Sequence, residues 1–341
     1  MLYGATGRPT LGRLAPPRAT RHTESMISET ERQRRADLAR RRAPALKDWL
    51  GPCRVCPREC GADRLGGERG LCRTGDQVVV ASFGPHFGEE APLVGRGGSG
   101  AVFFAGCALR CCYCQNHEIS QAQPAEAAGQ KLEADELAMI FMAIQRRGCQ
   151  NLNLVTPSHV VPQIVEALAL AYDDGFGLPV VYNCSGYEQP ETLAQLEGLV
   201  DIYLTDLKYG GPQQFSQAPG YAELAQAAVR EMHRQVGDLV LGRAGLATRG
   251  LMVRHLVLPG GLADSAAVAR FLATEISVET YVNVMGQYRP AWLAAQVEGL
   301  DRPAQAWEVE AAREAFWRAG LRRLETPPLD RGAAPRSRAH N

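Results

Sequence analysis

Short runs of β-branched and apolar residues alternate with longer helical patterns from residue 101 onward. The six runs are AVFFAG (101–106), LNLVT (152–156), PVVYN (179–183), VDIYLTD (200–206), LMVRHLVLP (251–259) and TYVNVM (280–285). Helical patterns are predicted near 135–147, 160–173, 190–198, 221–235, 264–275 and 307–319. This alternation is typical of βαβ units around a parallel sheet. Six units are too few for an eight-stranded barrel, so we expect an α/β fold with an open, partial (β/α)6 TIM-like barrel.

The cysteines are concentrated in one part of the chain. The sequence contains ten, and eight of them fall between Cys53 and Cys114, where an even spread would put about two. Disulfide frameworks belong to small secreted domains, whereas this chain has 341 residues, 45% of them hydrophobic, and no apolar export signal. We therefore predict that the clustered cysteines bind metal.

The charge and hydropathy of the chain argue against several classes of protein. Acidic and basic residues are equal in number, 37 of each, so no single-sign field favours nucleic acid. No apolar run in the sequence approaches the roughly 20 residues that a membrane-spanning helix needs. We expect a cytoplasmic protein without membrane or nucleic-acid partners.

Four segments are expected along the chain. Residues 1–25 are rich in Arg, Thr and Pro and are predicted to be a disordered leader, and residues 326–341 are predicted to be a disordered tail. Residues 26–98 hold a charged helix, with Ser28 as its cap, and a cysteine-rich metal-binding segment. Residues 99–325 are expected to form the partial barrel.

Cys107, Cys111 and Cys114 form a C-x3-C-x2-C group directly after the first predicted strand. Functional residues of parallel α/β folds collect where strands end, and three thiolates on a short loop can hold one 4Fe-4S cluster. Three protein ligands leave the fourth iron open to a substrate or cofactor. The alternatives are a zinc knuckle and a chance grouping of buried thiols. Cys112 is off this spacing and is expected to be a packed neighbour rather than a ligand.

The same loop, with Tyr113 just before its last cysteine, resembles the signature loop of the radical S-adenosylmethionine enzymes. The resemblance implies that the open iron binds the amino and carboxylate groups of S-adenosylmethionine (SAM). One electron from the cluster then breaks the sulfonium bond and gives a 5′-deoxyadenosyl radical, which abstracts a hydrogen atom from a substrate. The protein's part is to hold and shield this chemistry.

Four later stretches narrow the resemblance to the pyruvate formate-lyase activating enzyme group. They are VYNCSGYE (181–188), DIYLTDLKY (201–209), VRHLVLPGG (253–261) and YVNVMGQYRP (281–290), and the likeness covers about residues 100–320. Activating enzymes abstract a hydrogen atom from a backbone glycine of a partner enzyme. The resemblance therefore implies a glycyl-radical enzyme or another protein as substrate, and a one-electron donor such as flavodoxin or ferredoxin.

The resemblance also assigns residues to the methionyl end of the cofactor. The family has a Gly-Gly-Glu segment after its second strand, but this chain reads LVTPSHV there. Thr156, Ser158 and His159 are expected to supply polar contacts in its place. His159 is equally suited to cap the helix that begins at Val160.

Asp206 and Lys208 match the Asp-x-Lys motif that the activating enzymes carry near the cofactor, and they are the predicted catalytic pair. Two-residue spacing on a strand places both side chains on one side. Arg254 matches an arginine suited to the methionine carboxylate. Asn183 and Ser185 fall where the family lines the adenosine and a cation site, although Asn183 stands where the family has an acid.

Three further positions follow the last predicted strand. Gln287, Tyr288 and Arg289 are suited to substrate contacts or to an ordinary loop exit. His255 alternates to the outer face of its strand, where packing is expected. Cys184 is expected to be a small core residue.

The second cysteine group comprises Cys53, Cys56, Cys60 and Cys72, spaced C-x2-C-x3-C-x11-C. Four ligands close a metal site, and neighbouring glycines allow the backbone to fold tightly around it. The segment has too few apolar residues to fold alone, so metal binding would supply its folding energy, on the order of 10 kcal/mol for zinc. Zinc and an auxiliary 4Fe-4S cluster both suit four thiolates. If both cysteine groups were purely structural, the chain would instead be a metal-stabilised binding or sensor protein.

Overall fold

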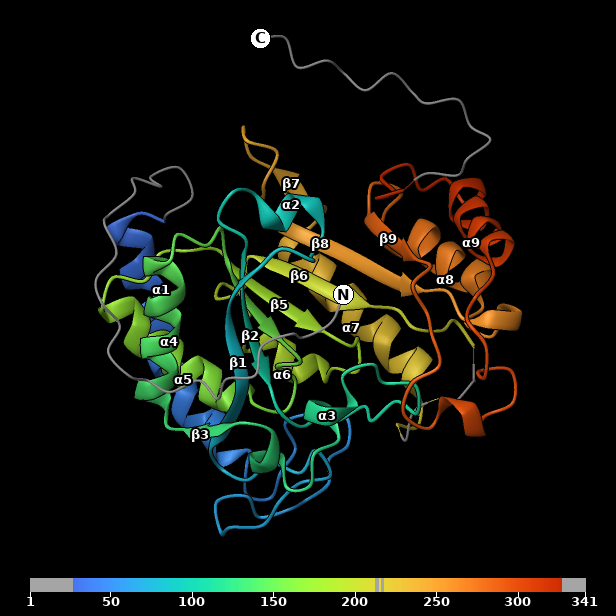
Figure 1. Ribbon diagram of the computed structural model, residues 1–341. Helices are drawn as coiled ribbons and strands as arrows, with labels where there is room; N and C mark the ends of the chain where they lie inside the picture. The colour runs from blue at the N-terminus through green and yellow to red at the C-terminus, as the bar shows by residue number, and fades with distance from the viewer. Residues whose placement is uncertain (1–26, 212–214, 216–217, 327–341) are drawn as a thin grey trace.

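The computed structural model describes residues 27–211, 215 and 218–326, so the predicted leader and residues 327–341 of the predicted tail lie outside the described residues. Within them, nine strands form one sheet in the order β3-β1-β2-β4-β5-β6-β8-β7, with β9 paired to β8 (Figure 1). The sheet is open rather than closed, since β3 lies at one end of this order and pairs with β1 alone.

Six neighbouring strands run parallel and follow one another in chain order. They are β2 (Ser99–Phe104), β4 (Leu152–Val155), β5 (Val180–Cys184), β6 (Ile202–Asp206), β8 (Ala247–Leu256) and β9 (Tyr281–Met285). These are the six strands expected from the sequence. Such runs are almost continuously apolar because both faces of a parallel sheet are covered. The predicted α/β class is therefore confirmed.

Three further strands escape the sequence pattern. β1 (Val78–His86) runs antiparallel to β2, β3 (Gln130–Leu132) runs antiparallel to β1, and β7 (Val240–Leu241) runs antiparallel to β8. β3 and β7 are too short for a periodic signal, and the register of β1 shifts between Val80 and Ser82. Through β1, the predicted N-terminal segment contributes a strand to the main sheet.

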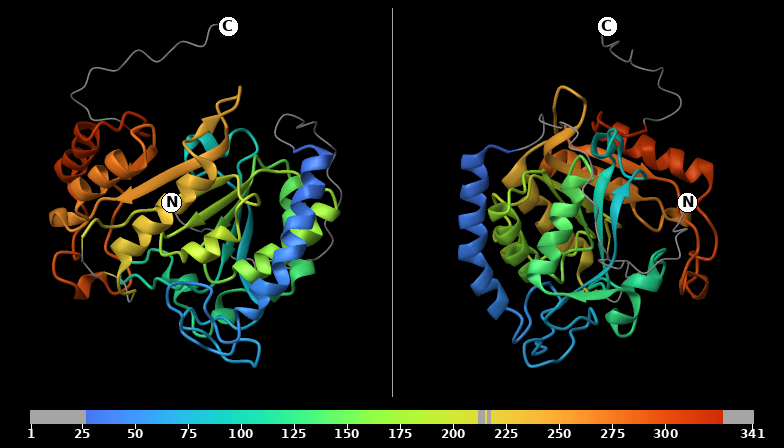
Figure 2. Two further views of the ribbon diagram at one scale, coloured as in Figure 1. Left: turned by 180° about the vertical axis from the view of Figure 1, so that it is seen from behind. Right: turned by 60° about the vertical axis from the view of Figure 1, so that its left-hand side comes forward.

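Helices connect the parallel strands and cover the outer side of the sheet (Figures 1 and 2). The longer ones are α4 (Ala134–Arg146), α5 (Val161–Asp173), α7 (Tyr221–Val236), α8 (Ser265–Phe271) and α9 (Ala306–Arg318). The shorter ones are α2 (Ala91–Val94), α3 (His117–Ser120), α6 (Pro190–Ala194), 3-10 turns at Ala125–Ala128, Pro259–Gly261 and Ala294–Gln296, and a π-helical turn at Leu272–Ile276. Each of the six predicted helical patterns corresponds to a helix.

Helix α1 (Glu29–Asp48) lies outside α5 as a further layer, which the right-hand view of Figure 2 shows at the edge of the molecule. It begins as expected, because the Ser28 hydroxyl accepts a hydrogen bond from the Glu31 amide at 3.2 Å. Arg35 is buried and donates to both carboxylate oxygens of Asp201, at 2.6 and 2.9 Å. The arginine-rich helix is therefore docked by charge rather than solvated along its whole length.

The inner side of the sheet carries its own small apolar cluster. Leu93 of α2 packs there against buried side chains of three strands, which are Val181, Ile202, Leu204 and Met252. Burial of each large aliphatic side chain contributes roughly 1.5–3 kcal/mol. Helix α2 lies near the amino ends of these strands and does not cover their carboxyl ends (Figure 1).

The two edges of the sheet are covered differently. β3 is three residues long and carries Lys131 at its centre. Next to β9, the Val282 amide donates to the Arg323 carbonyl at 3.0 Å, and the Val282 carbonyl accepts from the Glu325 amide at 2.9 Å. The outermost strand β3 is therefore short, and β9 is paired with residues 323–325 at Val282.

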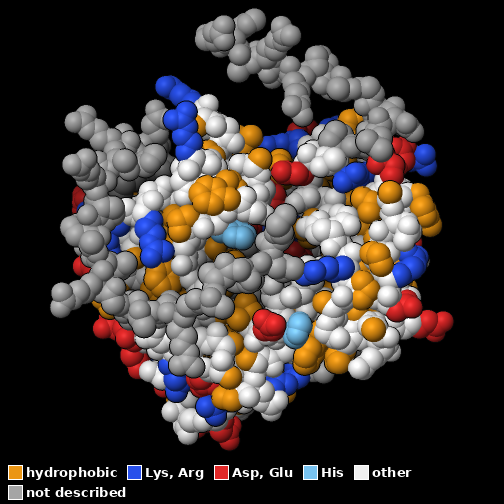
Figure 3. All heavy atoms as spheres, viewed as in Figure 1, with side chains coloured by type: hydrophobic (Ala, Val, Ile, Leu, Met, Phe, Trp, Pro, Cys, Tyr) orange, Lys and Arg blue, Asp and Glu red, His pale blue; other side chains and the backbone are white. Residues whose placement is uncertain are grey.

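The surface and the helices agree with the expected charge and hydropathy. On the face shown in Figure 3, Lys and Arg side chains are interspersed with Asp and Glu, as their equal numbers predict. In the described part of the chain, none of the helices combines the length and the apolar character that crossing a membrane requires.

Candidate functional site

The predicted site residues lie at the carboxyl edge of the parallel strands. β2 ends at Phe104, β4 at Val155, β5 at Cys184 and β6 at Asp206, and the predicted loops follow directly. Because the strands are parallel, their carboxyl ends meet at one edge of the sheet. Figure 1 shows α3 and the cysteine-rich loops at this edge, at the bottom of the view.

The loop with Cys107, Cys111 and Cys114 turns sharply out of β2. Gly106 has a left-handed φ of 83°, and a Cβ on it would lie 2.5 Å from the Cys72 carbonyl oxygen, so only glycine fits there. Cys111 is buried, the other two thiols of the loop are half-buried, and all three are free. The backbone that leads into the three-cysteine loop therefore touches the four-cysteine element.

The three thiols of this loop lie close enough to influence one another. Burial raises the pKa of Cys111, and the Lys208 ammonium group opposes that rise. Negative charge on Cys107 or Cys114 raises the pKa of Cys111 further. The Cys114 thiol also lies 3.1 Å from the Ser120 hydroxyl. The loop thus presents three neighbouring thiols beside a cation.

Asp206 and Lys208 form an ion pair next to this loop, with 2.5 Å between Lys208 Nζ and Asp206 Oδ2. Burial alone lowers the pKa of Lys208, but the Asp206 carboxylate outweighs that effect and the net pKa is raised. The side chains are 14% and 22% exposed, so the pair is largely withdrawn from water. Both side chains face the same side, as expected, and their catalytic role stays a prediction.

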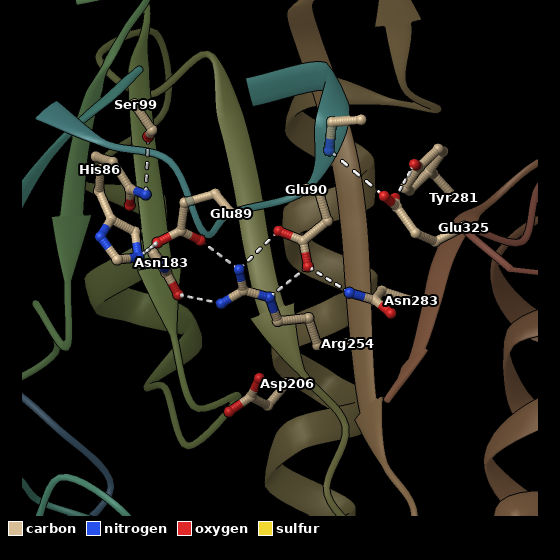
Figure 4. Close-up of polar contacts among 12 residues, drawn as sticks. His86, Glu89, Glu90, Ser99, Asn183, Asp206, Arg254, Tyr281, Asn283 and Glu325 are labelled. Atoms are coloured by element: carbon tan, nitrogen blue, oxygen red, sulfur yellow. Dashed lines mark hydrogen bonds and ion pairs between the residues drawn. The ribbon is translucent and has the colours of Figure 1, made fainter. Parts of the chain in front are cut away.

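Arg254 lies in a polar layer on the inner side of the sheet (Figure 4). Its guanidinium group makes two hydrogen bonds of 2.6 Å to Glu90, pairs with Glu89, and reaches Asn183 Oδ1 at 3.4 Å. Asn283 donates to the same Glu90 carboxylate at 2.8 Å. Burial lowers the pKa of Arg254, but the two carboxylates outweigh that effect and the net pKa is raised.

These partners change the expectation for Arg254. It is predicted to bind the methionine carboxylate, yet its donors are already engaged by Glu89 and Glu90, two residues that no sequence motif marked. Adjacent acids look solvent-exposed in a sequence, because acids are rarely buried unless they are paired. The sole local signal is that they directly precede the apolar segment APLV.

The residues that follow β4 contact different partners. Thr156 adopts a left-handed φ of 62°, which is uncommon for a β-branched residue, and its amide donates to the Asn183 carbonyl at 2.9 Å. His159 is buried, and its Nε2 donates to the Ala105 carbonyl at 2.9 Å. Burial lowers the pKa of His159 to about 4, so its imidazole is neutral near pH 7.

The alternative role of His159 as a helix cap is wrong. Helix α5 begins after Val160, and in the structure its N-cap has no side-chain hydrogen bond. Pro162 stands in the first turn and brings no amide proton, which reduces the need for a cap. The imidazole of His159 instead joins the start of α5 to the strand-end loop at Ala105.

A buried acid that no motif singled out lies next to Ser158. Glu188 accepts hydrogen bonds from the Ser158 hydroxyl and from the Tyr182 hydroxyl, the latter at 2.9 Å. Burial raises the pKa of Glu188 to about 7, and these two hydrogen bonds oppose the rise. Glu188 is the last residue of the stretch VYNCSGYE, which the sequence analysis identified. Its burial could not be predicted, because it depends on residues distant in the chain.

Asn183 and Ser185 both lie at the end of β5. Asn183 is buried and accepts from Arg254, which agrees with a place beside the predicted site. The Ser185 carbonyl accepts a hydrogen bond from the Tyr221 hydroxyl at 2.7 Å, and the same hydroxyl lies 3.2 Å from the Asp206 carbonyl. Tyr221 therefore fixes the ends of two neighbouring strands.

The residues that follow β9 differ in their exposure to solvent. Gln287 and Arg289 are exposed and remain available for substrate contacts. Tyr288 is buried, donates to the Leu300 carbonyl at 2.8 Å, and meets Tyr113 edge to face with 5.8 Å between ring centroids. A substrate contact for Tyr288 is therefore wrong, because its ring braces the cysteine loop from within the core.

The four-cysteine element, residues 53–72, holds its thiols in a compact loop. Cys53, Cys56 and Cys72 are buried, Cys60 is half-buried, and all four thiols are free. A Cβ on Gly70 would lie 3.2 Å from the Cys72 sulfur and 3.4 Å from the Cys60 sulfur. The absence of a side chain at this glycine therefore leaves room for two thiols.

Two arginines of the four-cysteine element reach the loops at the carboxyl edge. Arg58 donates to the Ala108 carbonyl at 2.8 Å and to the Leu109 carbonyl at 3.5 Å, both within the three-cysteine loop. Arg64 donates to the His159 carbonyl at 2.8 Å. The two cysteine groups are thus joined through backbone carbonyl groups of the site.

The donor chemistry of both groups suits a soft metal. Across residues 27–211, 215 and 218–326, no three His, Cys, Asp or Glu side chains are already gathered as ligands of a metal ion. The seven thiols are nevertheless free, and three or four thiolates are the ligand sets of an iron–sulfur cluster or zinc. Arg64 Nη2 and the Tyr113 hydroxyl, both buried beside the thiols, lack a partner in the described structure.

Comparison with known proteins reveals two relatives. No protein-family model matches the sequence. The chain is similar to Uncharacterized protein MJ0674 of Methanocaldococcus jannaschii, with 30% identity over 276 residues that cover 79% of this chain and 75% of the relative. It is also similar to Uncharacterized protein MJ0808 of the same organism, with 23% identity over 298 residues that cover 81% of each chain.

Proposed function

The chain belongs to the same family as MJ0674 of Methanocaldococcus jannaschii, whose name states no activity, and from this chain's own residues we propose that it is a radical SAM enzyme. The proposed reaction is reductive cleavage of SAM followed by abstraction of a hydrogen atom from a substrate. We also propose that the six parallel strands of this open α/β fold form a partial (β/α)6 TIM-like barrel. Six parallel strands in chain order support it, because successive βα units produce that order.

The observation that carries this proposal is the position of three free thiols at the carboxyl edge. Cys107, Cys111 and Cys114 follow the first parallel strand and lie beside the Asp206–Lys208 ion pair. They would be the ligands of a 4Fe-4S cluster, and three ligands leave one iron for the cofactor. When bound there, the cluster would supply the single electron that cleaves the sulfonium bond of SAM.

Lys208 has a defined electrostatic part in this proposal. Its ammonium group stays protonated between the Asp206 carboxylate and Cys111. Thiolate ligands bring negative charge into a site that is partly withdrawn from water, where a neighbouring cation offsets the cost. Asp206 fixes this cation by direct contact, and we propose that the pair also contacts SAM.

The residues after β4 and β5 would line the SAM site. Thr156 supports this because it adopts a left-handed backbone, a conformation that glycine adopts readily, at the place where the family has its Gly-Gly-Glu segment. Ser158, Asn183 and Ser185 would add polar contacts. Arg254 would reach the methionine carboxylate only by exchanging Glu89 or Glu90 for it.

The partners that we propose follow from the resemblance to the activating enzymes. The substrate would be a backbone glycine of a glycyl-radical enzyme or a group on another protein, and flavodoxin or ferredoxin would supply the electron. A cytoplasmic location fits this chemistry, because reduced thiols persist there. The ten free cysteines of the chain support that location.

Anaerobic reconstitution with iron and sulfide, followed by reduction with dithionite, tests the proposal. The wild-type protein is expected to show an iron–sulfur EPR signal and to release 5′-deoxyadenosine from SAM. Cys111→Ala should abolish 5′-deoxyadenosine formation and the EPR signal of the cluster in the three-cysteine loop, because it removes one of that cluster's three ligands. Cys112→Ala is the matched control, since it changes the adjacent thiol that is off the spacing, and both readouts should persist.

Two results would contradict the proposal. One is a wild-type protein that binds iron but forms no 5′-deoxyadenosine. The other is an equal loss of product in Cys111→Ala and Cys112→Ala. Either result would favour the alternative of a metal-stabilised binding or sensor protein, in which both cysteine groups hold structural zinc or iron–sulfur sites.

A further inference from the structure

Arg64, within the four-cysteine element, is the charged residue with the most complete burial. Its exposed fraction is 0%, although it lies in a glycine-rich loop. Its Nε donates to the Gly75 carbonyl at 2.7 Å, and its Nη1 donates to the His159 carbonyl at 2.8 Å. Nη1 also lies 3.8 Å from the Cys53 sulfur.

The charge of Arg64 has no acidic partner in the described part of the chain. None of the ion pairs there includes Arg64, and its Nη2 has no hydrogen-bond acceptor. Backbone carbonyl groups satisfy donors, but they do not neutralise a full charge. An isolated buried ion is costly by several kcal/mol, so buried arginines are ordinarily paired with an anion.

Arg254 shows how this fold pairs a buried arginine when it has acids available. Two carboxylates, from Glu89 and Glu90, bind its guanidinium group (Figure 4). Around Arg64 the corresponding groups are thiols, with Cys53 in direct contact and the other three cysteines in the same short element. An anion at this place can therefore come from the cysteines themselves.

Four thiolates around a zinc ion or an oxidised 4Fe-4S core carry a net charge of about −2. We propose that Cys53, Cys56, Cys60 and Cys72 hold a metal centre of net negative charge, and that Arg64 is its buried counter-ion. Arg64 then acts as an outer-shell residue that donates to the Cys53 ligand. Zinc and an iron–sulfur cluster share this chemistry.

The surroundings of the other thiols agree with a closed centre. The Thr74 hydroxyl lies 2.9 Å from the Cys72 sulfur, and both residues are buried. The space at Gly70 lies beside the Cys60 and Cys72 sulfurs. This inference concerns the four-cysteine element alone, so it stands or falls separately from the SAM chemistry proposed for the three-cysteine loop.

The test compares full-length wild-type protein with Arg64→Met and Arg64→Lys, and with Arg54→Met as the matched control. Arg54 belongs to the same element, but it is exposed and its guanidinium group lies over the Trp49 ring at 5.3 Å. Metal per chain is measured by elemental analysis during a chelator titration. Arg64→Met should lose its metal at a chelator concentration roughly 10- to 100-fold lower than wild type.

Charge balance predicts a second, opposite effect in metal-free protein. Removing the metal leaves the wild-type element with an unpaired buried cation, whereas Arg64→Met has none. Chelation should therefore lower the melting temperature of wild type more than that of Arg64→Met. Arg64→Lys keeps the charge and should resemble wild type in this comparison, although it loses part of the forked hydrogen bonding.

The source of the charge is identified in a Cys107→Ala, Cys111→Ala and Cys114→Ala background, where only the four-cysteine element can supply thiol ligands of either group. One zinc atom or about four iron atoms per chain supports the proposal and names the metal centre. Three results overturn it: no bound metal, equal retention by wild type and Arg64→Met, or equal shifts of melting temperature on chelation.

Discussion

The two cysteine groups meet at one edge of the sheet, but their surroundings differ. The three-cysteine loop lies beside Lys208, whose charge is already matched by Asp206, and two of its thiols are half-buried. The four-cysteine element surrounds Arg64, which is wholly buried and has no acidic partner among the described residues. The first environment suits a reactive centre with room for a ligand, and the second suits a closed centre that is part of the fold.

The two groups are nevertheless connected. Arg58 extends from the four-cysteine element to carbonyl groups between Cys107 and Cys111, and Gly106 touches the backbone at Cys72. The four-cysteine element therefore contacts the three-cysteine loop and helps to fix its backbone. We expect a change in the four-cysteine element to affect the three-cysteine loop, whereas the reverse effect should be small.

The largest expected effect comes from removing one thiol in each group. Cys72→Ser should lower the free energy of unfolding by more than about 4 kcal/mol, because it removes a ligand of the metal centre that we propose for the four-cysteine element. Cys114→Ser should lower it by less than about 1 kcal/mol but abolish 5′-deoxyadenosine formation. Denaturant titration of anaerobically prepared protein measures both. Equal destabilisation of the two variants would remove the distinction between the groups.

The next largest effect on unfolding free energy distinguishes Arg254, which is paired with acids, from Arg64, which is not. Glu90→Gln removes a carboxylate that binds Arg254 through two hydrogen bonds of 2.6 Å. The loss should be about 3 kcal/mol in unfolding free energy, because a buried pair loses one partner. The loss should be the same in metal-loaded and chelated protein, unlike that of Arg64→Met. The exposed Glu59→Gln is the control, and a strong metal dependence of Glu90→Gln would contradict the assignment.

We expect the free energy of unfolding to depend on pH by a similar amount through His255 of β8. His255 packs on the outer face as predicted, where Nδ1 donates to the Leu207 carbonyl at 2.7 Å and Nε2 accepts from the Ser265 hydroxyl at 2.9 Å. Burial lowers its pKa from 6.5 to about 4, while Asp206 and Asp264 act in the opposite direction. Its stabilising contribution is therefore complete above pH 6.5 and is lost as the pH falls toward 4, by up to about 3 kcal/mol.

Unfolding free energies measured between about pH 7 and pH 4.5 test this sign. His255→Gln should be less stable than wild type near pH 7 and should lose less stability on acidification. The pKa of His159 is lowered to the same value, so part of the acid sensitivity should remain in the variant. An identical pH slope in wild type and His255→Gln would show that this histidine is not the source.

The smallest effect on stability tests the connection between the groups. Arg58→Ala removes hydrogen bonds to the Ala108 and Leu109 carbonyls and should cost about 1 kcal/mol of unfolding free energy. It should also change the EPR line shape of the cluster proposed for the three-cysteine loop. Arg54→Ala, from the same element, should change neither. An unaltered EPR spectrum in Arg58→Ala would mean that the two groups are independent.

The parallel part of the fold could be predicted because its signals are local. Most residues of the parallel strands are buried, so each strand reads as a short apolar run, and most of the helices between them are long enough to show periodicity. β3 and β7 have three and two residues, so they are strands only because a neighbour pairs with them. β1 is longer, but Gly84 and Pro85 interrupt its pattern.

Site residues could be predicted where their spacing in the sequence determines their positions. They could not be predicted where their role depends on burial in the folded protein. C-x3-C-x2-C and Asp-x-Lys place their residues by sequence distance, and the structure brings Cys111 and Lys208 together. Arg64, Glu90 and Glu188 look like surface residues in the sequence, because their burial depends on elements distant in the chain. The cap proposed for His159 failed for the same reason, since its partner is the carbonyl of Ala105, in the loop after β2.

The way in which the sheet ends affects how the protein behaves when it is concentrated. Unpaired strand edges recruit the strands of other molecules, which is a common route to polymers and precipitates. Here the outermost strand β3 spans three residues with a lysine in the middle, and residues 323–325 pair with β9 at Val282. Both features reduce the length of strand edge on which another copy of the protein could add a strand.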